Sequence, residues 1–154
     1  MNDTPPVISP DLASIDQPLG DDSASIIRAL ATRLHDAGRI SDIDVFTDAA
    51  LAREALGSTV LPVGIAMPHA RSAAVTTASV TAARLPEAVT WSSGTDPVRI
   101  VLLIAAAGDD PDGYLALLQK VATACVKTSF VNELGSAATP EQLANLVAGA
   151  LGRR

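Results

Sequence analysis

A run of ten residues, Val98 to Ala107, limits the fold of this chain more than any other segment. Every residue in it except Arg99 is apolar, so other parts of the chain must cover both faces of the element that it forms. The length suits a central β-strand, although periodicity alone does not exclude a helix. Turn-forming residues, Gly108 to Gly113, follow it directly and favour the strand. We therefore expect a sheet with this strand near its centre.

Helices that could cover such a sheet are predicted from apolar residues at helical spacing and from end signals. The first helix ends before Gly38 and the second at Gly57, in each case a glycine in the usual C-terminal position. The last has Thr139 as N-cap, Pro140 at its first helical position and Gln142 to close a capping box. The predicted helices and helical turns cover residues 23–37, 41–57, 114–127, 129–134 and 139–151.

The remaining apolar segments predict short strands. The segment Val63 to Met67 is broken by Gly64 and closed by Pro68. This pattern predicts a short strand that ends in a constrained turn, with His69 at the edge of a sheet. We expect a short edge element at residues 7–15. The predicted strands cover residues 63–67, 75–85, 89–91 after Pro86, and 98–107.

Strands and helices on one chain of 154 residues predict a single α/β domain, in which a mixed β-sheet is flanked by helices on both faces. We expect residues 1–6 to form a flexible N-terminus and residues 7–154 to form the domain. No internal repeat or linker interrupts the sequence.

Charge and composition argue against several classes of function. The net charge of −6 disfavours a nucleic-acid binder, because phosphate backbones require clustered Lys and Arg, and the 11 basic residues here are scattered. The acidic balance fits a basic protein partner, or it simply keeps the domain in solution. An aromatic content of 3% argues against stacking platforms. We expect a cytoplasmic protein without membrane insertion, because no apolar run approaches about 18 residues and the first residues lack a secretory pattern.

The sequence contains no clear motif for binding a metal or a nucleotide. Two histidines and one cysteine lie far apart, and phosphate-loop and dinucleotide fingerprints are absent. The Asp-rich segment 108–113 could imitate a cation loop, but its proline and the lack of a following bidentate Glu favour an ordinary turn. His35 fits a helix end and Cys125 an apolar helix face. We therefore expect no metal and no cofactor.

One stretch carries a resemblance to a known family. Its residues are Arg53-Glu54, then Gly57-Ser58-Thr59, then Gly64-Ile65-Ala66-Met67-Pro68-His69. They resemble the signature of the fructose/mannitol-type EIIA domain of the bacterial phosphoenolpyruvate:sugar phosphotransferase system (PTS). The likeness extends over nearly all of Val7 to Leu151. It implies that family's fold, of the phosphotransferase/anion transport protein-like kind.

The resemblance implies that this chain is a phosphotransferase that works as a phosphocarrier. In such a protein a phosphohistidine on HPr donates its phosphoryl group to His69, and His69 passes it to an EIIB partner without a nucleotide or metal. Elementary chemistry agrees, because neutral imidazole is nucleophilic near pH 7 and its phosphorylated form is a good phosphoryl donor. Such transfer mainly requires in-line positioning and stabilisation of charge on the phosphoryl oxygens.

Residues around His69 have both a functional and a structural interpretation. Arg53 matches the family's arginine position, where a guanidinium suits bidentate contact with phosphoryl oxygens; the alternative is a helix-end arginine that serves the helix dipole. Ser58 and Thr59 could donate hydrogen bonds to the phosphoryl group or belong to an ordinary turn after a helix. We interpret Arg71 and Ser72 as solvated loop residues.

The sequence departs from the family at two positions. Some relatives carry a second histidine at the start of the helix after the Asp-rich segment, where this chain has Tyr114. A phenol can donate a hydrogen bond to a phosphoryl oxygen but cannot supply an imidazolium, so we expect a less electropositive site. Alternatively, the Tyr114 ring simply packs at the helix start. Ala70 stands where relatives often have Gly, which restricts the turn slightly.

Two functions follow from these residues. In the first, the chain relays phosphate to EIIB during PTS uptake of a fructose- or mannitol-type sugar. In the second, it is a regulatory module of the nitrogen type, whose phosphorylation state at His69 controls binding to other proteins. A third interpretation is a degenerate fold that binds partners without phosphotransfer.

Overall fold

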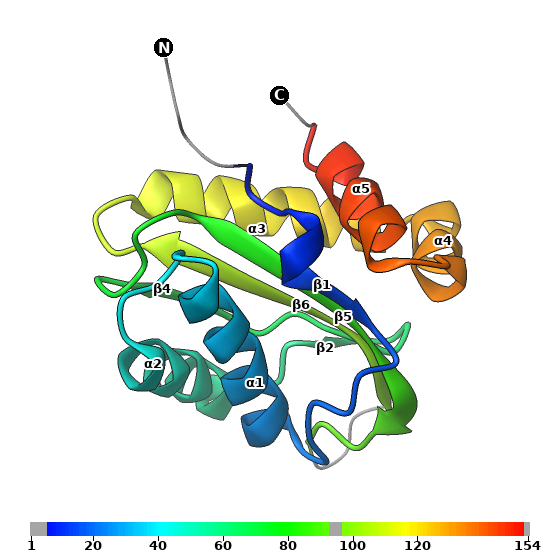
Figure 1. Cartoon of the computed structure of the whole chain (residues 1–154), viewed down its shortest axis with the longest axis horizontal. Helices are drawn as coiled ribbons and strands as arrows, with labels where there is room; N and C mark the ends of the chain where they lie inside the picture. Colours follow the sequence, from blue (N-terminus) through cyan, green and yellow to red (C-terminus); the bar gives the residue numbers. More distant parts are fainter. Residues whose placement is uncertain (1–5, 93–96, 153–154) are drawn as a thin grey trace.

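The computed structural model describes residues 6–92 and 97–152, which form one mixed β-sheet covered by helices (Figure 1). Within these residues the sheet has six strands in the order β1-β5-β6-β3-β2, and β4 also pairs with β6. The strands are β1 (Ala13–Ile15), β2 (Val60–Leu61), β3 (Ile65–Ala66), β4 (His69–Ser72), β5 (Ser79–Val89) and β6 (Val98–Ala107). The predicted α/β class with a mixed sheet is confirmed.

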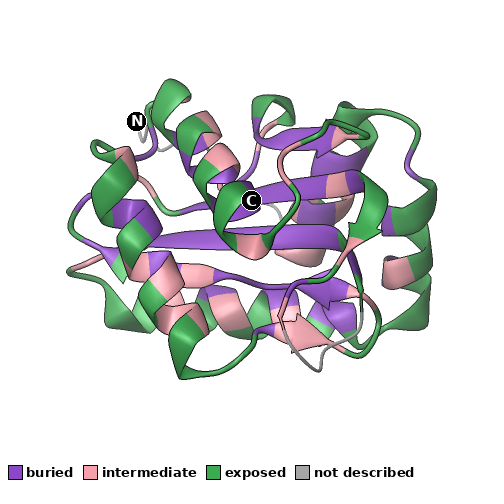
Figure 2. Cartoon of the chain, turned by 90° about the horizontal axis from the view of Figure 1, so that it is seen from below, coloured by how far each residue is buried: buried purple, intermediate pink, exposed green. Residues whose placement is uncertain are grey.

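Strand β6 lies at the centre of the sheet, as its apolar sequence predicts. It pairs antiparallel with β5 along one edge and parallel with β3 and β4 along the other. Every residue of β6 is buried except Arg99, which is exposed, and Ala107, which is half-buried. Figure 2 shows the buried residues concentrated in the strands, with exposed residues on the outer helix faces.

The helices form two groups. Helix α1 packs against α2, whereas α3, α4 and α5 pack against one another, and each group also contacts the sheet (Figure 1). Their bounds are α1 (Ser23–Asp36), α2 (Ile43–Leu56), α3 (Pro111–Cys125), α4 (Thr128–Ser136) and α5 (Pro140–Ala150), with a short 3₁₀ helix, η1 (Pro10–Leu12), before β1. The predicted helices are therefore present, and the expected turn at 129–134 is a complete helix.

Side-chain caps explain where the helices begin. Asp22 and Asp42 accept hydrogen bonds from backbone N–H groups in the first turns of α1 and α2. Thr139 caps α5 as predicted, although the Gln142 side chain accepts from the N–H of Ala138, one residue before the N-cap. Asp110 caps α3, so this helix begins at the following proline. The loop predicted for 108–113 is therefore wrong in its second half.

Two strand predictions are wrong for reasons of sheet pairing. Residues 79–89 form one strand, β5, which continues through Pro86, so 89–91 is not a separate strand. The regular register of β5 against β6 breaks between Arg84 and Val89, which removes the need for a ladder hydrogen bond at the proline. His69 lies in strand β4 and not in a turn. Strands β3 and β4 pair with β6 on either side of a break at Met67 and Pro68.

The predicted N-terminal segment, residues 1–6, lies outside the described residues except for Pro6. The carbonyl of Pro6 accepts a hydrogen bond of 2.8 Å from Nη1 of Arg39. Arg39 is only 5% exposed, and the same nitrogen donates to the Ser79 hydroxyl at 3.0 Å. This buried guanidinium therefore ties the start of the chain to the loop after α1 and to β5.

The tight turn between β2 and β3 yields a test of the fold. Gly64 has φ +79°, and a Cβ there would lie 3.3 Å from the Pro97 carbonyl oxygen. We expect Gly64→Ala to lower the free energy of unfolding by about 1–2 kcal/mol, because L-residues are strained in this region. Gly149→Ala is the matched control: its Cβ would meet nothing within 4 Å in α5, so it should stabilise by up to about 1 kcal/mol. Urea unfolding followed by circular dichroism measures both, and equal effects would contradict the assignment of the turn.

Candidate functional site

His69 is held by the backbone immediately before it. It is the first residue of β4, pairs with Ile104 of β6 and is half-buried. Its Nδ1 lies 2.7 Å from the carbonyl oxygen of Met67. Because a carbonyl only accepts, Nδ1 carries the proton in this hydrogen bond. The neutral ring therefore has its lone pair on Nε2, the nitrogen suited to act as a nucleophile.

The backbone that holds the imidazole is itself fixed on both sides. The N–H of Met67 donates to the carbonyl of Thr59 at 3.1 Å, which extends the β2–β3 pairing by one step. The carbonyl of Pro68 accepts from the N–H of Ile104 at 3.0 Å. Proline also restricts the residue before it to extended geometry. The Met67 carbonyl is thus held in position to accept the hydrogen bond from Nδ1 of His69.

Arg53, in the last turn of α2, lies close enough to His69 to influence its charge. Burial lowers the pKa of His69 most strongly, the hydrogen bond to the Met67 carbonyl raises it, the positive charge of Arg53 lowers it and the negative charge of Glu54 raises it. The net result is a pKa below the ordinary value of 6.5, so the neutral ring is favoured. Nη1 of Arg53 also donates to the Gly57 carbonyl at 2.8 Å, which is the contact expected of a helix-end arginine.

Tyr114 lies beside the imidazole. The two ring centroids are 6.0 Å apart and the ring planes meet at 50°. Burial raises the pKa of the Tyr114 phenol, and the charges of Arg53 and Arg71 lower it in part. The phenol is therefore neutral near pH 7 and can donate a hydrogen bond. The structure brings His69, Arg53 and Tyr114 together, although they are far apart in the sequence.

The side chains of Ser58 and Thr59 form hydrogen bonds within the turn after α2, and the Ser58 hydroxyl also accepts from the Ser92 hydroxyl at 3.3 Å. The Ser58 hydroxyl oxygen accepts from the N–H of Val60 at 3.1 Å. Thr59 is only 8% exposed, and its hydroxyl donates to the carboxylate of Glu54. Their support of a phosphoryl group stays a prediction.

Sequence reasoning missed Arg71. Arg71 and Ser72 lie in β4, so their interpretation as loop residues is wrong. Alternation along a strand places Arg71 on the same face as His69, and its charge reaches Tyr114. Its Nη1 donates to the Gly108 carbonyl at 2.8 Å. The sequence does show that His69 and Arg71 are two residues apart. This spacing places them on one face only if the segment is a strand, which the sequence alone did not predict.

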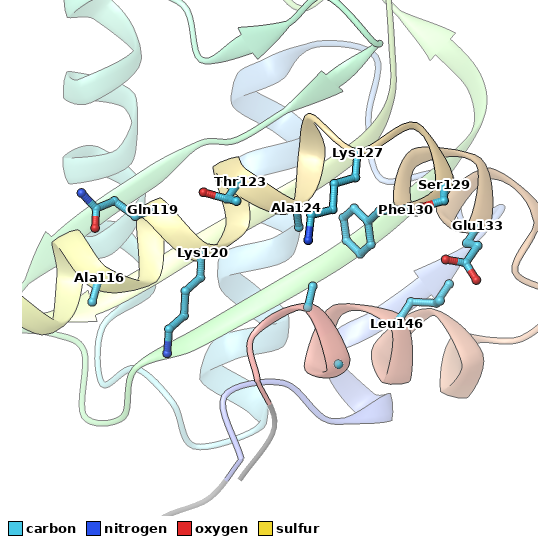
Figure 3. A pocket seen from close by; sticks show the side chains of 12 residues that line it. Ala116, Gln119, Lys120, Thr123, Ala124, Lys127, Ser129, Phe130, Glu133 and Leu146 are labelled. Carbon is cyan, nitrogen blue, oxygen red and sulfur yellow. The ribbon is translucent and has the colours of Figure 1, made fainter.

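A separate groove of about 560 Å³ lies between α3, α4 and α5 (Figure 3). Both lysines of the chain, Lys120 and Lys127, line it, with Phe130 and Leu146 among its apolar residues. None of the five predicted site residues lines this groove. The candidate site is therefore the surface around His69.

The sequence profile of the family "Phosphoenolpyruvate-dependent sugar phosphotransferase system, EIIA 2" matches residues 7–149. The chain belongs to this family.

Similar proteins include a PTS system 2-O-alpha-mannosyl-D-glycerate-specific EIIABC component from Escherichia coli (strain K12). It is 33% identical over 120 residues, which cover 76% of this chain and 18% of that protein. The chain thus spans less than a fifth of the length of this relative.

Solved structures share the fold. The crystal structure of nitrogen regulatory protein IIA-Ntr from Neisseria meningitidis has a TM-score of 0.81 at 23% identity, and the match covers 92% of this chain and 96% of that one. A complex of enzyme IIAMTL and phosphorylated enzyme IIBMTL from Escherichia coli matches with a TM-score of 0.74 at 22% identity, and the match covers 90% of this chain and 95% of that one.

Across residues 6–92 and 97–152, no helix has the length and hydropathy needed to cross a membrane.

The environment of His69 yields a pH prediction. We expect NMR titration to give a pKa below 6.5 for His69 in the folded protein, because burial disfavours the imidazolium. The unfolded chain then takes up the proton first as the pH falls. The stability of the wild type relative to His69→Gln should be complete above pH 6.5 and should decrease below it. A titration in denaturant provides the unfolded reference, and a folded-state pKa at or above that reference would contradict the prediction.

Proposed function

We propose that this chain is a cytoplasmic phosphocarrier, which accepts a phosphoryl group from phospho-HPr on Nε2 of His69 and passes it to an EIIB component during PTS sugar uptake of the fructose/mannitol type. The observation that carries the proposal is the hydrogen bond of 2.7 Å from Nδ1 of His69 to the Met67 carbonyl, which leaves the lone pair on Nε2 of a half-exposed ring. Residues 7–154 would act as one unit in this relay.

The proposed reaction is a transfer between two nucleophiles. The lone pair on Nε2 of His69 attacks phosphorus as the bond between phosphorus and the donor's ring nitrogen breaks, and the electron pair of that bond returns to the donor. The second step reverses the roles: the acceptor's nucleophile attacks phosphorus, and the electron pair of the Nε2–phosphorus bond returns to the imidazole. A lowered pKa keeps His69 neutral, which both steps require of the free ring.

Charge on the phosphoryl oxygens is the main demand of such a transfer. Arg53 is the proposed source of positive charge, because its guanidinium already acts electrostatically on His69. Tyr114 would add a hydrogen bond from its neutral phenol, since its ring lies beside the imidazole. Ser58 and Thr59 are retained as proposed support through the turn that holds this end of α2.

Partner proteins must reach a group on the surface, and exposed apolar residues close in sequence to Arg53 and Tyr114 support such docking. Leu56 follows Arg53 at the end of α2 and is 84% exposed, and Leu115 follows Tyr114 in α3 and is 56% exposed. One of the structural neighbours is a complex of enzyme IIAMTL with phosphorylated enzyme IIBMTL. By analogy we propose HPr as donor and EIIB as acceptor. At 22% and 23% identity, the IIAMTL–IIBMTL complex and IIA-Ntr both establish the fold alone, so neither decides between the relay and the regulatory alternative.

Phosphorylation of His69 can be tested directly. We expect the protein to gain one acid-labile phosphate when incubated with phosphoenolpyruvate, enzyme I and HPr, and His69→Ala to gain none. His35→Ala is the matched control, because His35 is exposed and is the only other histidine. Mass spectrometry and phosphate release in acid measure the product. Loss of phosphorylation in the His35 variant alone would reassign the site.

The acceptor decides between the two roles. Phosphorylated protein should lose its phosphate to a cognate EIIB domain if it relays phosphate for sugar uptake. Retention of the phosphate with every EIIB tested, together with binding of another protein that depends on phosphorylation, would favour the regulatory role.

Arg53 yields a second prediction for the transfer. We expect Arg53→Met to slow phosphorylation by about 100-fold, because it removes charge stabilisation from the transition state. Arg28→Met is the control, since Arg28 pairs with Asp44 on the exposed surface, and it should change the rate little. Rapid-quench measurement with phospho-HPr gives the rate, and thermal unfolding checks that the variants fold. An Arg53→Met rate equal to that of the control would exclude the proposed role.

A further inference from the structure

We propose that Glu54 is a positioning residue for His69, which holds the imidazole in one tautomer through Thr59 and the backbone of Met67. This inference rests on the phosphoryl relay proposed above and adds a residue to it. Glu54 touches none of the reacting atoms in this scheme. Its role would be to fix where Nε2 lies and which ring nitrogen carries the proton.

The contacts form a continuous path from α2 to the imidazole. The Glu54 carboxylate accepts from both the hydroxyl and the N–H of Thr59, the latter at 3.4 Å. The carbonyl of Thr59 accepts from the N–H of Met67 at 3.1 Å. The carbonyl of Met67 then accepts from Nδ1 of His69 at 2.7 Å. Four residues, from the last turn of α2 to the start of β4, are thereby held in one register.

The contacts of Thr59 explain why position 54 needs a side chain that accepts hydrogen bonds, such as a carboxylate. Thr59 is only 8% exposed, so its hydroxyl and N–H depend on partners within the protein. Loss of the acceptor would leave two donors near the protein interior without their partner, which favours movement of Thr59. Thr59 directly precedes β2 and lies opposite Met67, so its movement would shift the carbonyl that holds His69.

Glu54 also contributes to the electrostatics of the site. The charged and titratable groups around His69 are Arg53 and Glu54 from α2, Tyr114 from α3 and Arg71 from β4. Among the groups that act on His69, the negative charge of Glu54 raises its pKa and the positive charge of Arg53 lowers it. A variant that lacks the charge but keeps an acceptor for the Thr59 hydroxyl should therefore differ from one that lacks the charge and both acceptors, and this difference makes the proposal testable.

The experiment compares Glu54→Gln with Glu54→Ala. Gln removes the charge but keeps one oxygen that can accept from the Thr59 hydroxyl, and loses the second oxygen, which accepts from the Thr59 N–H. Ala removes the charge and both acceptor oxygens. Asp48→Asn is the matched control, because Asp48 is an exposed carboxylate on the same helix. Two-bond ¹H–¹⁵N correlation spectra report which nitrogen of His69 is protonated. Phosphorylation by phospho-HPr is measured from pH 5 to pH 8.

We expect Glu54→Gln to retain the Nδ1–H tautomer and most of the rate at pH 8, with the acid limb of its pH profile displaced to lower pH. We expect Glu54→Ala to show a mixture of tautomers and a rate about 10-fold to 100-fold lower at pH 8, since small misplacement of a reacting group has large kinetic effects. At pH 8 the imidazole is neutral in every variant, so this loss reflects position alone.

Thr59→Val provides a second route to the same result, because it removes the hydroxyl that Glu54 holds while leaving the charge. It should also produce a tautomer mixture, and this readout remains available if Glu54→Ala does not fold. A single Nδ1–H tautomer in both Glu54→Ala and Thr59→Val would overturn the proposal. Failure of the wild type to accept phosphate would overturn the proposed function instead, while the spectra would still decide the positioning role.

Discussion

The pairing of β6 with strands on both of its edges is the interaction on which the site depends. Because β4 runs parallel to β6, the two strands end at the same edge of the sheet, and the chain leaves β6 there to enter α3. Gly108 permits this exit, since a Cβ at that position would lie 3.0 Å from the backbone nitrogen of Ala73. Tyr114 thereby reaches His69. The pairing of β4 with β6, which buries apolar residues in the core, thus also sets the distance between His69 and Tyr114.

Local signals account for the part of the fold that the sequence predicts well. A helix end depends on residues within one turn, so caps such as Asp42 and Thr139 are visible without knowledge of the rest of the chain. The ten apolar residues of β6 carry a comparable signal, because only burial on both faces explains them. For the same reason, the family signature around His69 is readable from the sequence, because its glycines and its proline influence the local backbone geometry.

Strand pairing explains what the sequence does not reveal. Pro86 suggests the end of a strand, and only the irregular register against β6 shows that the strand continues. His69 and Arg71 follow a proline, which favours a place outside a strand, yet β6 offers a parallel partner that extends the sheet past it. The connection of Glu54 to His69 passes through Thr59, which lies opposite Met67 only because β2 and β3 pair. Such contacts join residues whose spacing in sequence carries no signal of its own.

Tyr114 changes how a site of this kind would be charged. A second histidine would contribute positive charge only while protonated, so the charge of the site would vary with pH across the neutral range. A phenol with a raised pKa stays neutral there, and the positive charges that act on Tyr114 are those of Arg53 and Arg71. In the proposed relay, a guanidinium and not an imidazolium then supplies the positive charge that meets the phosphoryl oxygens, and the protonation of His69 sets the acid limit. With Tyr114 in place of a second histidine, arginine would stabilise the charge on the phosphoryl oxygens, and His69 would remain the nucleophile.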